Sequence, residues 1–367
     1  MEKQKVIHST CLEPAVASAV AECEHDRTFI LVDETTSRLC LPVVAGFDCL
    51  RGAEVITIGA TDEHKTLDSL AHVWTSLQQG GATRHSLMVN LGGGMVTDLG
   101  GFAAATFKRG LNYINIPTTL LAMVDASVGG KTGINFGGLK NEVGVFSTAR
   151  SVILDTTFLR TLDHENILSG YAEMLKHGLI SPDRSMWAEL LTFGLDVPDY
   201  HQLSRMLEDS VKVKERIVEQ DPTEQGLRKA LNLGHTVGHA FESLALRRSL
   251  STHTAHLSTH TAHPSPLLHG YAVAYGLICE LYLSCVKTGF PTETMRQTVN
   301  FIHENYGRMD ITCDDYPALL ELMTHDKKNV AGEINFTLLG DIGDLRINQT
   351  ATRREIEEAL DFYREGC

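Results

Sequence analysis

Apolar and polar positions follow two different periods in the first part of the chain. Short apolar runs that stop at an acid, a glycine or a proline predict strands. These runs lie at 28–33, 54–58, 85–94 and 113–119. Between them, residues 64–78 carry apolar side chains at helical spacing. Because strand and helix alternate, we expect residues 1–160 to form an α/β domain around a parallel sheet.

Long amphipathic stretches replace this pattern beyond about residue 160. Their apolar positions recur at helical spacing, and glycines fall between them or at their edges, which predicts helices. These stretches lie at 163–180, 198–219, 229–248, 268–288, 292–306 and 315–325. An apolar run at 334–339 predicts one short strand. The second domain, residues 161–367, is therefore expected to be mostly α-helical.

One segment inside this second domain is biased in composition. Residues 251–263 read STHTAHLSTHTAH, with the hexapeptide STHTAH repeated at a period of seven. Such low-complexity polar sequence is typical of a flexible surface loop. Its histidines could bind a metal ion adventitiously, but we expect a flexible insertion and place no chemistry there.

Composition and charge narrow the classes of function. The 367 residues carry a formal net charge of −14, which disfavours a broad nucleic-acid surface because phosphate binding needs clustered Lys and Arg. No stretch approaches the roughly 20 apolar residues of a membrane span, and the N-terminus lacks the apolar core of a secretory signal. Eight scattered cysteines without a CxxC pair indicate reduced thiols. We expect a cytoplasmic protein that binds neither nucleic acid nor membrane.

The first chemical motif is GGGMVTD, from Gly92 to Asp98, which follows a predicted strand. Glycines at this point let backbone N–H groups approach a pyrophosphate. The usual GxGxxG dinucleotide pattern is absent, so the motif alone favours a tight turn over a phosphate site. Asp33, at the end of another predicted strand, would either accept hydrogen bonds from a ribose or cap a helix.

The second motif is PTTLLAMVDASVGGKTG, from Pro117 to Gly133. Its Gly-Lys-Thr triplet lacks the spacing of a nucleoside triphosphate loop, because Asp125 stands where that loop requires glycine. What remains is Lys131 beside paired glycines, followed by Lys140 and Asn141. This density of polar groups between glycines favours an oxyanion site.

The third motif is a set of metal-ligand candidates. Glu173 lies in YAEMLKH, His235 and His239 lie in LNLGHTVGH, and His269 opens HGYAVAYG. One carboxylate and two imidazoles suit a catalytic zinc ion with an open fourth position. His235 and His239 are four residues apart and share a helix face, so either both bind metal or one of them moves protons.

Basic residues in an acidic chain point to a focused anion site. Lys176 lies three residues after Glu173, on the same helix face. Further basic candidates are Lys214, Arg228, Lys327 and Lys328. They would clamp phosphate and carboxylate groups, or each would be a solvated surface charge.

These motifs occur together and in one order, and the chain resembles the 3-dehydroquinate synthase family over about residues 28–340. The motifs that carry the resemblance are GGGMVTDLGGF, PTTLLAMVDASVGGKTG, LKNEVGVF, AEMLKHG, GLRKALNLGHTVGHAFE, HGYAVAYG and DKKN. The resemblance implies a Rossmann-like N-terminal domain that binds NAD and a helical, metal-binding C-terminal domain, a dehydroquinate synthase-like fold.

The resemblance also implies roles for single residues. The metal ligands would be Glu173, His235 and His269, with zinc or cobalt as the ion. The catalytic set would be His239, Asp125, Lys131, Lys176 and Glu224. The cofactor-contacting set would be Asp33, Asp62, Lys65, Gly93, Gly94, Met95, Asp98, Thr118, Thr119, Lys131, Lys140, Phe158 and Thr161. The substrate-binding set would be Arg109, Asn141, Lys214, Arg228, Asn232, Lys327 and Lys328. Arg109 would reach the phosphate site of a neighbouring subunit, which implies a homodimer.

The implied reaction converts 3-deoxy-D-arabino-heptulosonate 7-phosphate to 3-dehydroquinate and phosphate in the shikimate pathway. A hydroxyl of this phosphorylated sugar acid is oxidised by NAD, phosphate leaves, the ketone is reduced again, and the opened ring closes to a carbocycle. Arg228, Asn232 and Lys214 match positions that face the substrate carboxylate. Related sugar phosphate cyclases usually differ there. The alternatives are another such cyclase, or a metal-dependent polyol dehydrogenase of the glycerol dehydrogenase type.

Overall fold

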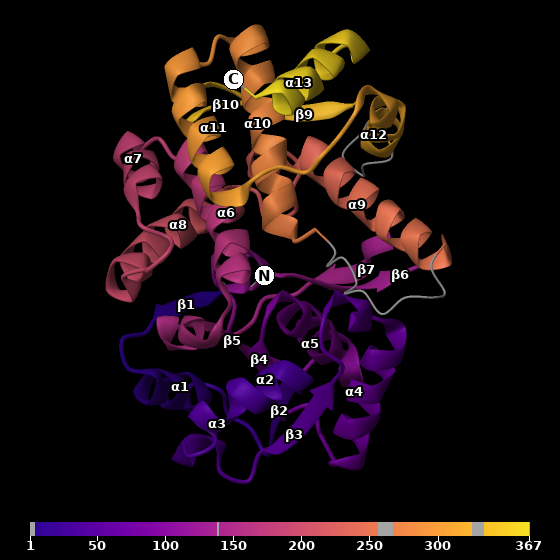
Figure 1. Cartoon of the computed structure of the whole chain (residues 1–367). Coiled ribbons are helices and arrows are strands. Elements are labelled where there is room, and N and C mark those ends of the chain that lie inside the picture. Colours follow the sequence, from indigo (N-terminus) through magenta and orange to yellow (C-terminus); the bar gives the residue numbers. More distant parts are fainter. Residues whose placement is uncertain (1–3, 138, 256–266, 325–333, 367) are drawn as a thin grey trace. The chain divides into compact units, whose positions relative to one another are not determined.

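The computed structural model describes residues 4–137, 139–255, 267–324 and 334–366 of the chain (Figure 1). These residues form two compact units. Unit 1 contains Met1–Gly170 and Tyr200–Glu215, and unit 2 contains Tyr171–Asp199 and Arg216–Cys367. Each unit is described by itself. The division at residue 160 stays a proposal; the compact units place residues 161–170 and one later helical segment with unit 1.

Unit 1 is built on a six-stranded sheet in the order β1-β8-β5-β4-β2-β3. Every neighbouring pair is parallel. The strands are β1 (Lys5–His8), β2 (Thr28–Asp33), β3 (Glu54–Ile58), β4 (Leu87–Gly92), β5 (Asn112–Pro117) and β8 (Ser151–Leu154). Strands β4 and β8 are buried along their whole length, as expected of a parallel sheet covered on both faces. The predicted α/β fold with a parallel sheet is confirmed.

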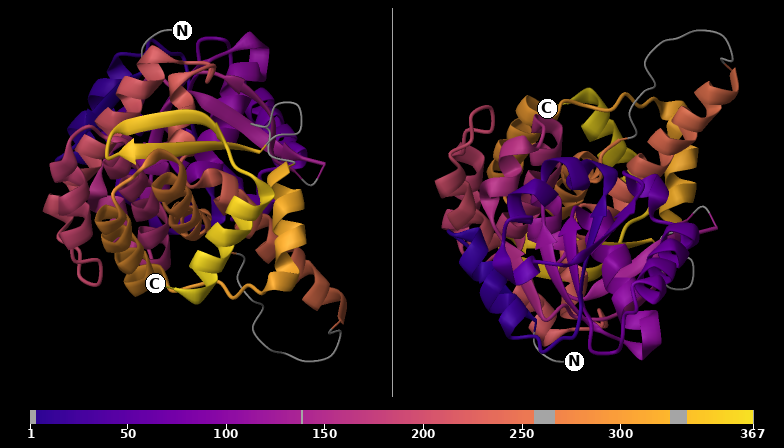
Figure 2. Two further views of the ribbon diagram at one scale, coloured as in Figure 1. Left: turned by 90° about the horizontal axis from the view of Figure 1, so that it is seen from above. Right: turned by 90° about the horizontal axis from the view of Figure 1, so that it is seen from below.

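The strand order reverses between β2 and β4, because β3 lies beyond β2 whereas β5 lies beyond β4. Right-handed crossovers therefore send helices to opposite faces of the sheet, as Figures 1 and 2 show. The helices of the first face are α1 (Leu12–Ala21), α2 (Glu34–Leu39) and α3 (Leu41–Val44), and those of the second are α4 (Leu67–Gln79) and α5 (Gly94–Thr106). Ligands of such sheets bind outside the carboxyl ends of the strands at the reversal point.

Several smaller elements complete unit 1. An antiparallel hairpin joins β6 (Lys131–Phe136) to β7 (Leu139–Phe146). The short helical turns are η1 (Asp48–Leu50), η2 (Asp62–His64), η3 (Phe107–Arg109), the π-turn η4 (Ala122–Ala126) and η5 (Thr156–Thr161). Helix α8 (Tyr200–Gln220) contributes its residues up to Glu215. The hairpin was not predicted, because its first strand overlaps the glycine-rich motif.

Unit 2 is mostly helical, as predicted. Its helices are α6 (His164–Ile180), of which Tyr171 onward belongs here, α7 (Arg184–Thr192), η6 (Leu227–Asn232), α9 (His235–Ala255), α10 (His269–Thr288), α11 (Thr292–Tyr306), η7 (Cys313–Asp315), α12 (Tyr316–Thr324) and α13 (Arg353–Glu365). The predicted strand at 334–339 is β9 (Asn335–Asp341), which pairs with β10 (Asp344–Thr350). Among the described residues, none of the helices combines the length and apolar character needed to cross a membrane.

Helices α9 and α10 pack closely because small residues line their contact. A Cβ atom on Gly276 of α10 would lie 1.9 Å from the backbone oxygen of Gly234, just before α9. Gly234 has a φ of 79°, a conformation that favours glycine. The predicted helix at 229–248 is therefore wrong at its start: η6 ends at Asn232, the chain turns at Gly234, and α9 begins at His235.

The His-rich segment departs partly from its prediction as a loop. Residues up to Ala255 continue helix α9, so the expected loop at 251–263 is wrong for its first five residues. Ser, Thr, His and Ala can all continue a helix, and no glycine or proline interrupts them before Pro264. The remainder of the repeat lies outside the described residues.

Candidate functional site

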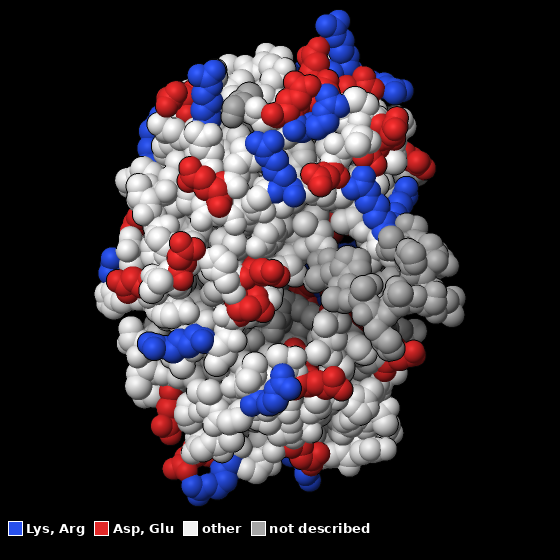
Figure 3. Space-filling view, viewed as in Figure 1, with Lys and Arg blue, Asp and Glu red and all other residues white. Residues whose placement is uncertain are grey.

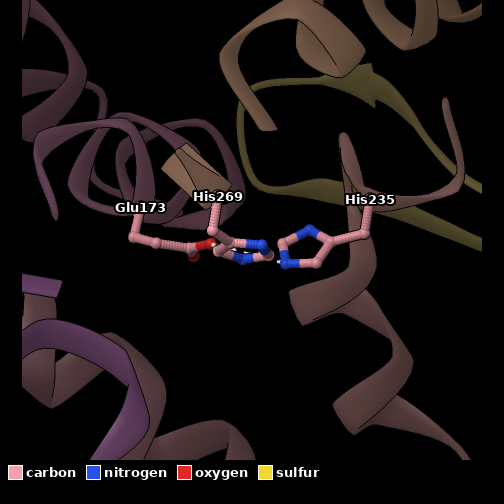
Figure 4. A group of neighbouring side chains, drawn as sticks. All are labelled: Glu173, His235 and His269. Atoms are coloured by element: carbon pink, nitrogen blue, oxygen red, sulfur yellow. Dashed lines mark ion pairs between the residues drawn. The ribbon is translucent and has the colours of Figure 1, made fainter. Parts of the chain in front are cut away.

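The three predicted metal ligands of unit 2 meet at one point. Glu173 lies on α6, His235 is the first residue of α9, and His269 is the first residue of α10. Figure 4 shows the three side chains pointing toward one another. One ligand atom from each lies within 4.8 Å of the others. Residues separated by almost one hundred positions are thus assembled by the close packing of these helices.

The distances in this cluster fit a bound divalent cation. Glu173 Oε1 lies 3.4 Å from Nε2 of His235 and 3.5 Å from Nε2 of His269. These separations exceed those of a formed N–H···O bond. A tetrahedral ion with ligand bonds of about 2.0–2.1 Å would separate its ligand atoms by about 3.4 Å. Both Glu173 oxygens are buried and accept no hydrogen bond. Oε2 is paired with Lys176, and an ion between the imidazoles would satisfy Oε1. The residues fit the ion.

The electrostatics of the cluster also favour a cation. Burial of the Glu173 carboxyl disfavours its charged form, but Lys176 and His235 outweigh burial and hold its pKa well below its usual range. Lys176 is itself buried and forms an ion pair with Glu173. Burial lowers the pKa of His269, but the carboxylates of Glu173 and Glu242 outweigh burial and raise that pKa to about 10. The carboxylates therefore stabilise positive charge at this imidazole.

Groups around the ligands were not predicted from the sequence. Nδ1 of His235 lies 3.1 Å from the carbonyl oxygen of Leu233, an arrangement that leaves Nε2 for the cluster. Glu242 lies 3.5 Å from Nδ1 of His269. Glu280 of α10 is fully buried and accepts hydrogen bonds from the backbone N–H groups of Gly234 (2.6 Å) and Val237 (3.1 Å). It therefore fixes the start of α9, the helix that carries His235.

His239 lies one turn beyond His235 on α9, as its spacing predicted. Its ring centroid is 5.3 Å from that of His235 and 5.9 Å from that of His269. Its half-buried side chain is next to the cluster without belonging to the Glu173 triad. The structure thus places His239 beside the cluster, and its role in proton transfer stays a prediction.

The glycine motif of unit 1 forms the turn from β4 to α5, at the reversal point of the sheet. Gly93 is the N-cap of α5 and Gly94 its first residue. The positive end of the helix dipole and the N–H groups of the first helical turn therefore lie where an anion would bind. Thr118 and Thr119 follow the adjacent strand β5, and Thr118 is buried. This geometry favours the phosphate interpretation of the motif over a tight turn alone.

Asp33 caps a helix, which is one of the two roles that its sequence position allowed. One of its carboxylate oxygens accepts hydrogen bonds of 2.8 Å from the N–H groups of Thr35 and Thr36. Thr36 returns a capping-box contact to the backbone of Asp33. These bonds fix the carboxylate at the carboxyl end of β2, beside the reversal point. Contact with a ribose stays a prediction.

A buried polar network surrounds Lys65. Its Nζ lies 2.5 Å from Oδ2 of Asp98 and also donates to Oδ1 of Asn141. Lys65 is 4% exposed. Burial raises the pKa of Asp98, against the opposing effect of the Lys65 ammonium. Three predicted residues, which are 33 and 43 positions apart in sequence, are thus joined in one network.

The remaining charged candidates of unit 1 differ in exposure. Lys214 of α8 is buried, and its Nζ lies 2.5 Å from Oδ1 of Asp125. Lys140 and Asp62 form a more exposed ion pair at 3.5 Å. Lys131 is exposed at the start of β6. Among these candidates the structure thus pairs Lys214 with Asp125 and Lys140 with Asp62.

Other predicted positions of unit 1 lie on turns and helix starts. Met95 is half-buried in the first turn of α5. Phe158 is buried in η5, where the Thr161 hydroxyl donates to its carbonyl oxygen. Arg109 is exposed on a turn where Lys108, Arg109 and Gly110 have successive φ values of 48°, 70° and 114°. Left-handed conformation is unusual for the first two residues and is often found at functional positions.

Arg228 and Asn232 lie in the segment that precedes α9. Arg228 is 2% exposed, and its Nη1 donates to the carbonyl oxygen of Pro222 at 2.6 Å. Asn232 donates to the Glu224 carboxylate at 3.0 Å. Asp221, which the sequence did not single out, accepts hydrogen bonds from three backbone N–H groups of this segment. Lys327 and Lys328 lie outside the described residues.

The charged side chains on one face of the described residues form no large patch of a single sign. On the face drawn in Figure 3, blue and red side chains are interspersed among white ones. Several of the basic candidates are instead buried inside the two units: Lys65, Lys176, Lys214 and Arg228. Buried basic groups of this kind suit small anionic groups better than a broad polyanion.

Comparison with known proteins agrees with this geometry. The family model described as 3-dehydroquinate synthase N-terminal matches residues 55–169, and that described as 3-dehydroquinate synthase C-terminal matches residues 170–329. The chain is 52% identical over 366 residues to a 3-dehydroquinate synthase of Parabacteroides distasonis. That match covers 100% of this chain and 99% of the relative.

Solved structures share the fold at lower identity. A 2-deoxy-scyllo-inosose synthase complexed with carbaglucose-6-phosphate, NAD+ and Co2+ matches with a TM-score of 0.83, 22% identity and coverage of 99% of this chain and 96% of the other. A 2-epi-5-epi-valiolone synthase from Streptomyces hygroscopicus subsp. jinggangensis with NAD+ and Zn2+ matches with a TM-score of 0.77, 24% identity and coverage of 100% and 98%. With both family models and a full-length relative in agreement, the chain belongs to the 3-dehydroquinate synthase family.

Proposed function

We propose that the protein converts 3-deoxy-D-arabino-heptulosonate 7-phosphate to 3-dehydroquinate and phosphate, with NAD and a zinc or cobalt ion. This reaction belongs to the shikimate pathway and to aromatic amino-acid biosynthesis, and it makes the enzyme a phosphate-eliminating lyase. The observation that carries the proposal is the convergence of Glu173, His235 and His269 in a chain 52% identical along its length to a 3-dehydroquinate synthase.

The metal-binding residues would be the cluster of unit 2. A bound divalent cation supplies a Lewis acid for the oxygen that changes between hydroxyl and carbonyl. Glu173 contributes a buried carboxylate, and His235 presents Nε2 because its Nδ1 faces the carbonyl oxygen of Leu233. His239, half-buried beside the cluster, would hold or accept a proton on its imidazole during the reaction.

The cofactor-binding residues would be those at the carboxyl ends of β2, β4 and β5. Bound NAD supplies the hydride acceptor and later the hydride donor. Gly93 and Gly94 would give backbone N–H groups to its pyrophosphate, because they begin a helix at the reversal point of the sheet. The Lys65–Asp98 pair would fix the orientation of neighbouring polar groups, since both members are held by a 2.5 Å contact.

The anionic ends of the substrate need basic partners. We assign the phosphate group to Lys131, Asn141 and Lys176, with one or both of Lys327 and Lys328. We assign the carboxylate to Arg228, whose planar guanidinium offers two parallel N–H donors, with Asn232 and Lys214. Glu224 would hold the Asn232 amide in place, because it accepts a hydrogen bond from it.

We propose further that the protein is a cytoplasmic homodimer in which Arg109 serves the phosphate site of the partner subunit. Two observations support this assignment. Arg109 is exposed on a turn of unusual backbone conformation, and the hairpin β6–β7 of the same unit exposes large apolar side chains. These are Phe136, Leu139, Val143, Val145 and Phe146. Sedimentation at low protein concentration tests the dimer, and a monomeric, fully active enzyme would contradict it.

The deciding experiment supplies 3-deoxy-D-arabino-heptulosonate 7-phosphate, NAD and either zinc or cobalt, and follows phosphate release. We expect release, and we expect Arg228→Ala to raise KM strongly while leaving NAD affinity unchanged. Absence of release, together with turnover of glycerol, glucose 6-phosphate or sedoheptulose 7-phosphate, would replace the proposal by a polyol dehydrogenase or another sugar phosphate cyclase. An unchanged KM of the Arg228 variant would remove the carboxylate assignment alone.

A further inference from the structure

Glu242 stands beside the metal cluster without belonging to the Glu173 triad. It lies on α9, three residues after His239 and seven after His235, so two helical turns bring it back to the face that carries His235. Its carboxylate oxygen Oε2 lies 3.5 Å from Nδ1 of His269. Its side chain is only 13% exposed, so this charge is placed inside the unit rather than in solvent.

The His269 ring lies between two carboxylates. Nε2 faces Glu173 at 3.5 Å and Nδ1 faces Glu242 at 3.5 Å. An imidazole that binds a metal through one nitrogen carries its proton on the other, and an acceptor at that second nitrogen selects the tautomer. A carboxylate is acceptor-only when ionised. At 3.5 Å the Glu242 carboxylate is not yet hydrogen-bonded to Nδ1, but its charge faces that nitrogen. A proton on Nδ1 is therefore favoured, which leaves Nε2 to face Glu173 as a metal ligand.

His269 depends on this contact more than His235 does. Nδ1 of His235 faces a backbone carbonyl, which is held in place by the chain itself. The His269 side chain is 28% exposed, against 11% for His235 and 0% for Glu173. It also stands at the very start of α10, where the N-cap Leu268 gives no side-chain hydrogen bond. Of the two histidines, His269 is the one whose second ring nitrogen faces a replaceable side chain rather than a backbone carbonyl.

We propose that Glu242 is a positioning residue that orients His269 for metal binding. The inference rests on the proposed function only in assuming that the cluster holds a divalent cation. A second cation on His239, Glu242 and His269 is the competing explanation, because their ligand atoms also lie within 4.8 Å of one another. The contacts favour positioning, since an ion on both ring nitrogens would require the imidazole to lose both protons.

Zinc binding to the metal-free full-length protein tests the proposal without substrate or NAD. A chromogenic chelator that competes for zinc reports affinity and stoichiometry. We expect Glu242→Ala to weaken the zinc affinity by about 10-fold to 100-fold. Glu242→Gln should lose less, because its amide oxygen still accepts a hydrogen bond from Nδ1. The charge-matched control Glu293→Gln, an exposed carboxylate on α11, should bind as the wild type does.

The outcomes separate this inference from the proposed function. His235→Ala should lose zinc binding; if the wild type binds no better than His235→Ala, the metal site of the proposed function is wrong. If His235→Ala loses binding but both Glu242 variants keep wild-type affinity, only the role of Glu242 is wrong. Loss of a second zinc equivalent, with the first unchanged, would replace positioning by a second cation site. Should Glu242→Ala not fold, the near-isosteric Glu242→Gln decides.

Discussion

The polar groups of the two units are arranged differently, although unit 2 also has a buried pair, Lys176 with Glu173. In unit 1 the buried lysines are already paired: Lys65 with Asp98, and Lys214 with Asp125. In unit 2 the Glu173 carboxylate faces two imidazoles at 3.4 and 3.5 Å, too far for hydrogen bonds but right for ligands of one ion. The paired lysines of unit 1 could exchange their carboxylate partners for groups of a bound ligand. The ligands of a single ion in unit 2 must instead be positioned before the ion binds.

The comparison predicts that substitution of any one metal ligand in unit 2 abolishes most of the activity, and that no second substitution restores it. In His235→Ala we expect phosphate release to fall by about 1,000-fold or more, equivalent to about 4 kcal/mol, because the Lewis acid is lost. Chelation of the wild-type metal should give the same loss, and added zinc or cobalt should reverse it only in the wild type. Phosphate release by His235→Ala at a rate near that of the wild type would show that the cluster is not the metal site.

In unit 1, by contrast, removal of one partner should be repaired by removal of the other. Lys65→Ala leaves the Asp98 carboxylate buried without its ammonium partner, which should lower the free energy of unfolding by about 3–5 kcal/mol. Asp98→Asn in the same chain should recover most of this loss, although NAD binding should not return. Denaturant midpoints measure both effects.

The exposed pair Lys140–Asp62 gives the control for that prediction. Lys140→Ala should leave the midpoint within experimental error, because exposed ion pairs contribute little. An equal loss in Lys65→Ala and in the double variant would mean that Lys65 stabilises unit 1 by packing rather than by charge.

Two closely packed glycines, one in each unit, offer a pair of tests. A Cβ on Gly276 would lie 1.9 Å from the Gly234 oxygen, and one on Gly100 would lie 2.1 Å from Oδ1 of Asn90. We expect Gly276→Ala and Gly100→Ala each to cost about 1–3 kcal/mol of stability. Gly276→Ala should also weaken zinc binding while sparing NAD binding, because it separates α9 from α10. Fluorescence titration and chelator competition measure the two affinities.

Each glycine has a control in the same unit. Gly46 in unit 1 and Gly194 in unit 2 would place a new Cβ in open space, so alanine there should change neither stability nor affinity. If Gly276→Ala weakened NAD and zinc binding equally, the helix contact would not be specific to the cluster.

An exposed ion pair outside both candidate sites should give the smallest change in the free energy of unfolding. Lys287 donates a hydrogen bond to Glu355, and with the Thr352 N–H it lowers the pKa of Glu355 to about 2. This lowered pKa stabilises the fold above the ordinary value of 4.5, and the contribution is lost as pH falls through about 2. Glu355→Gln should therefore lose under about 1 kcal/mol at neutral pH and nothing near pH 2. A difference that persisted at low pH would exclude the carboxylate charge as its cause.

The sequence predicted the features that depend on local pattern, such as strand positions and the face of a helix on which a residue lies. The β2 and β3 runs at 28–33 and 54–58 were located to the residue, because apolar strands of a parallel sheet contrast with the helices between them. The shared face of His235 and His239 follows from their spacing on a helix. The start of α9 was wrong because an amphipathic pattern continues across Gly234, and only the packing of α10 forces the turn there.

Single residues that act through tertiary contacts could not be predicted. Glu242 and Glu280 look like ordinary helix carboxylates, and Asp221 like an ordinary turn residue. Their partners are a ring nitrogen 27 positions away for Glu242 and backbone N–H groups more than 40 positions away for Glu280. The only available signal for Glu280 was a charge within the otherwise apolar stretch of α10, which requires a buried partner.

The most direct test of the account measures phosphate and NADH in one reaction with 3-deoxy-D-arabino-heptulosonate 7-phosphate, substoichiometric NAD and zinc. If the metal cluster of unit 2 and the proposed cofactor site of unit 1 serve one cyclising reaction, NAD is regenerated in each turnover. We then expect many phosphates released per NAD and no accumulation of NADH. One NADH formed for each product molecule, or NADH formed without phosphate, would contradict the account and indicate a simple dehydrogenase.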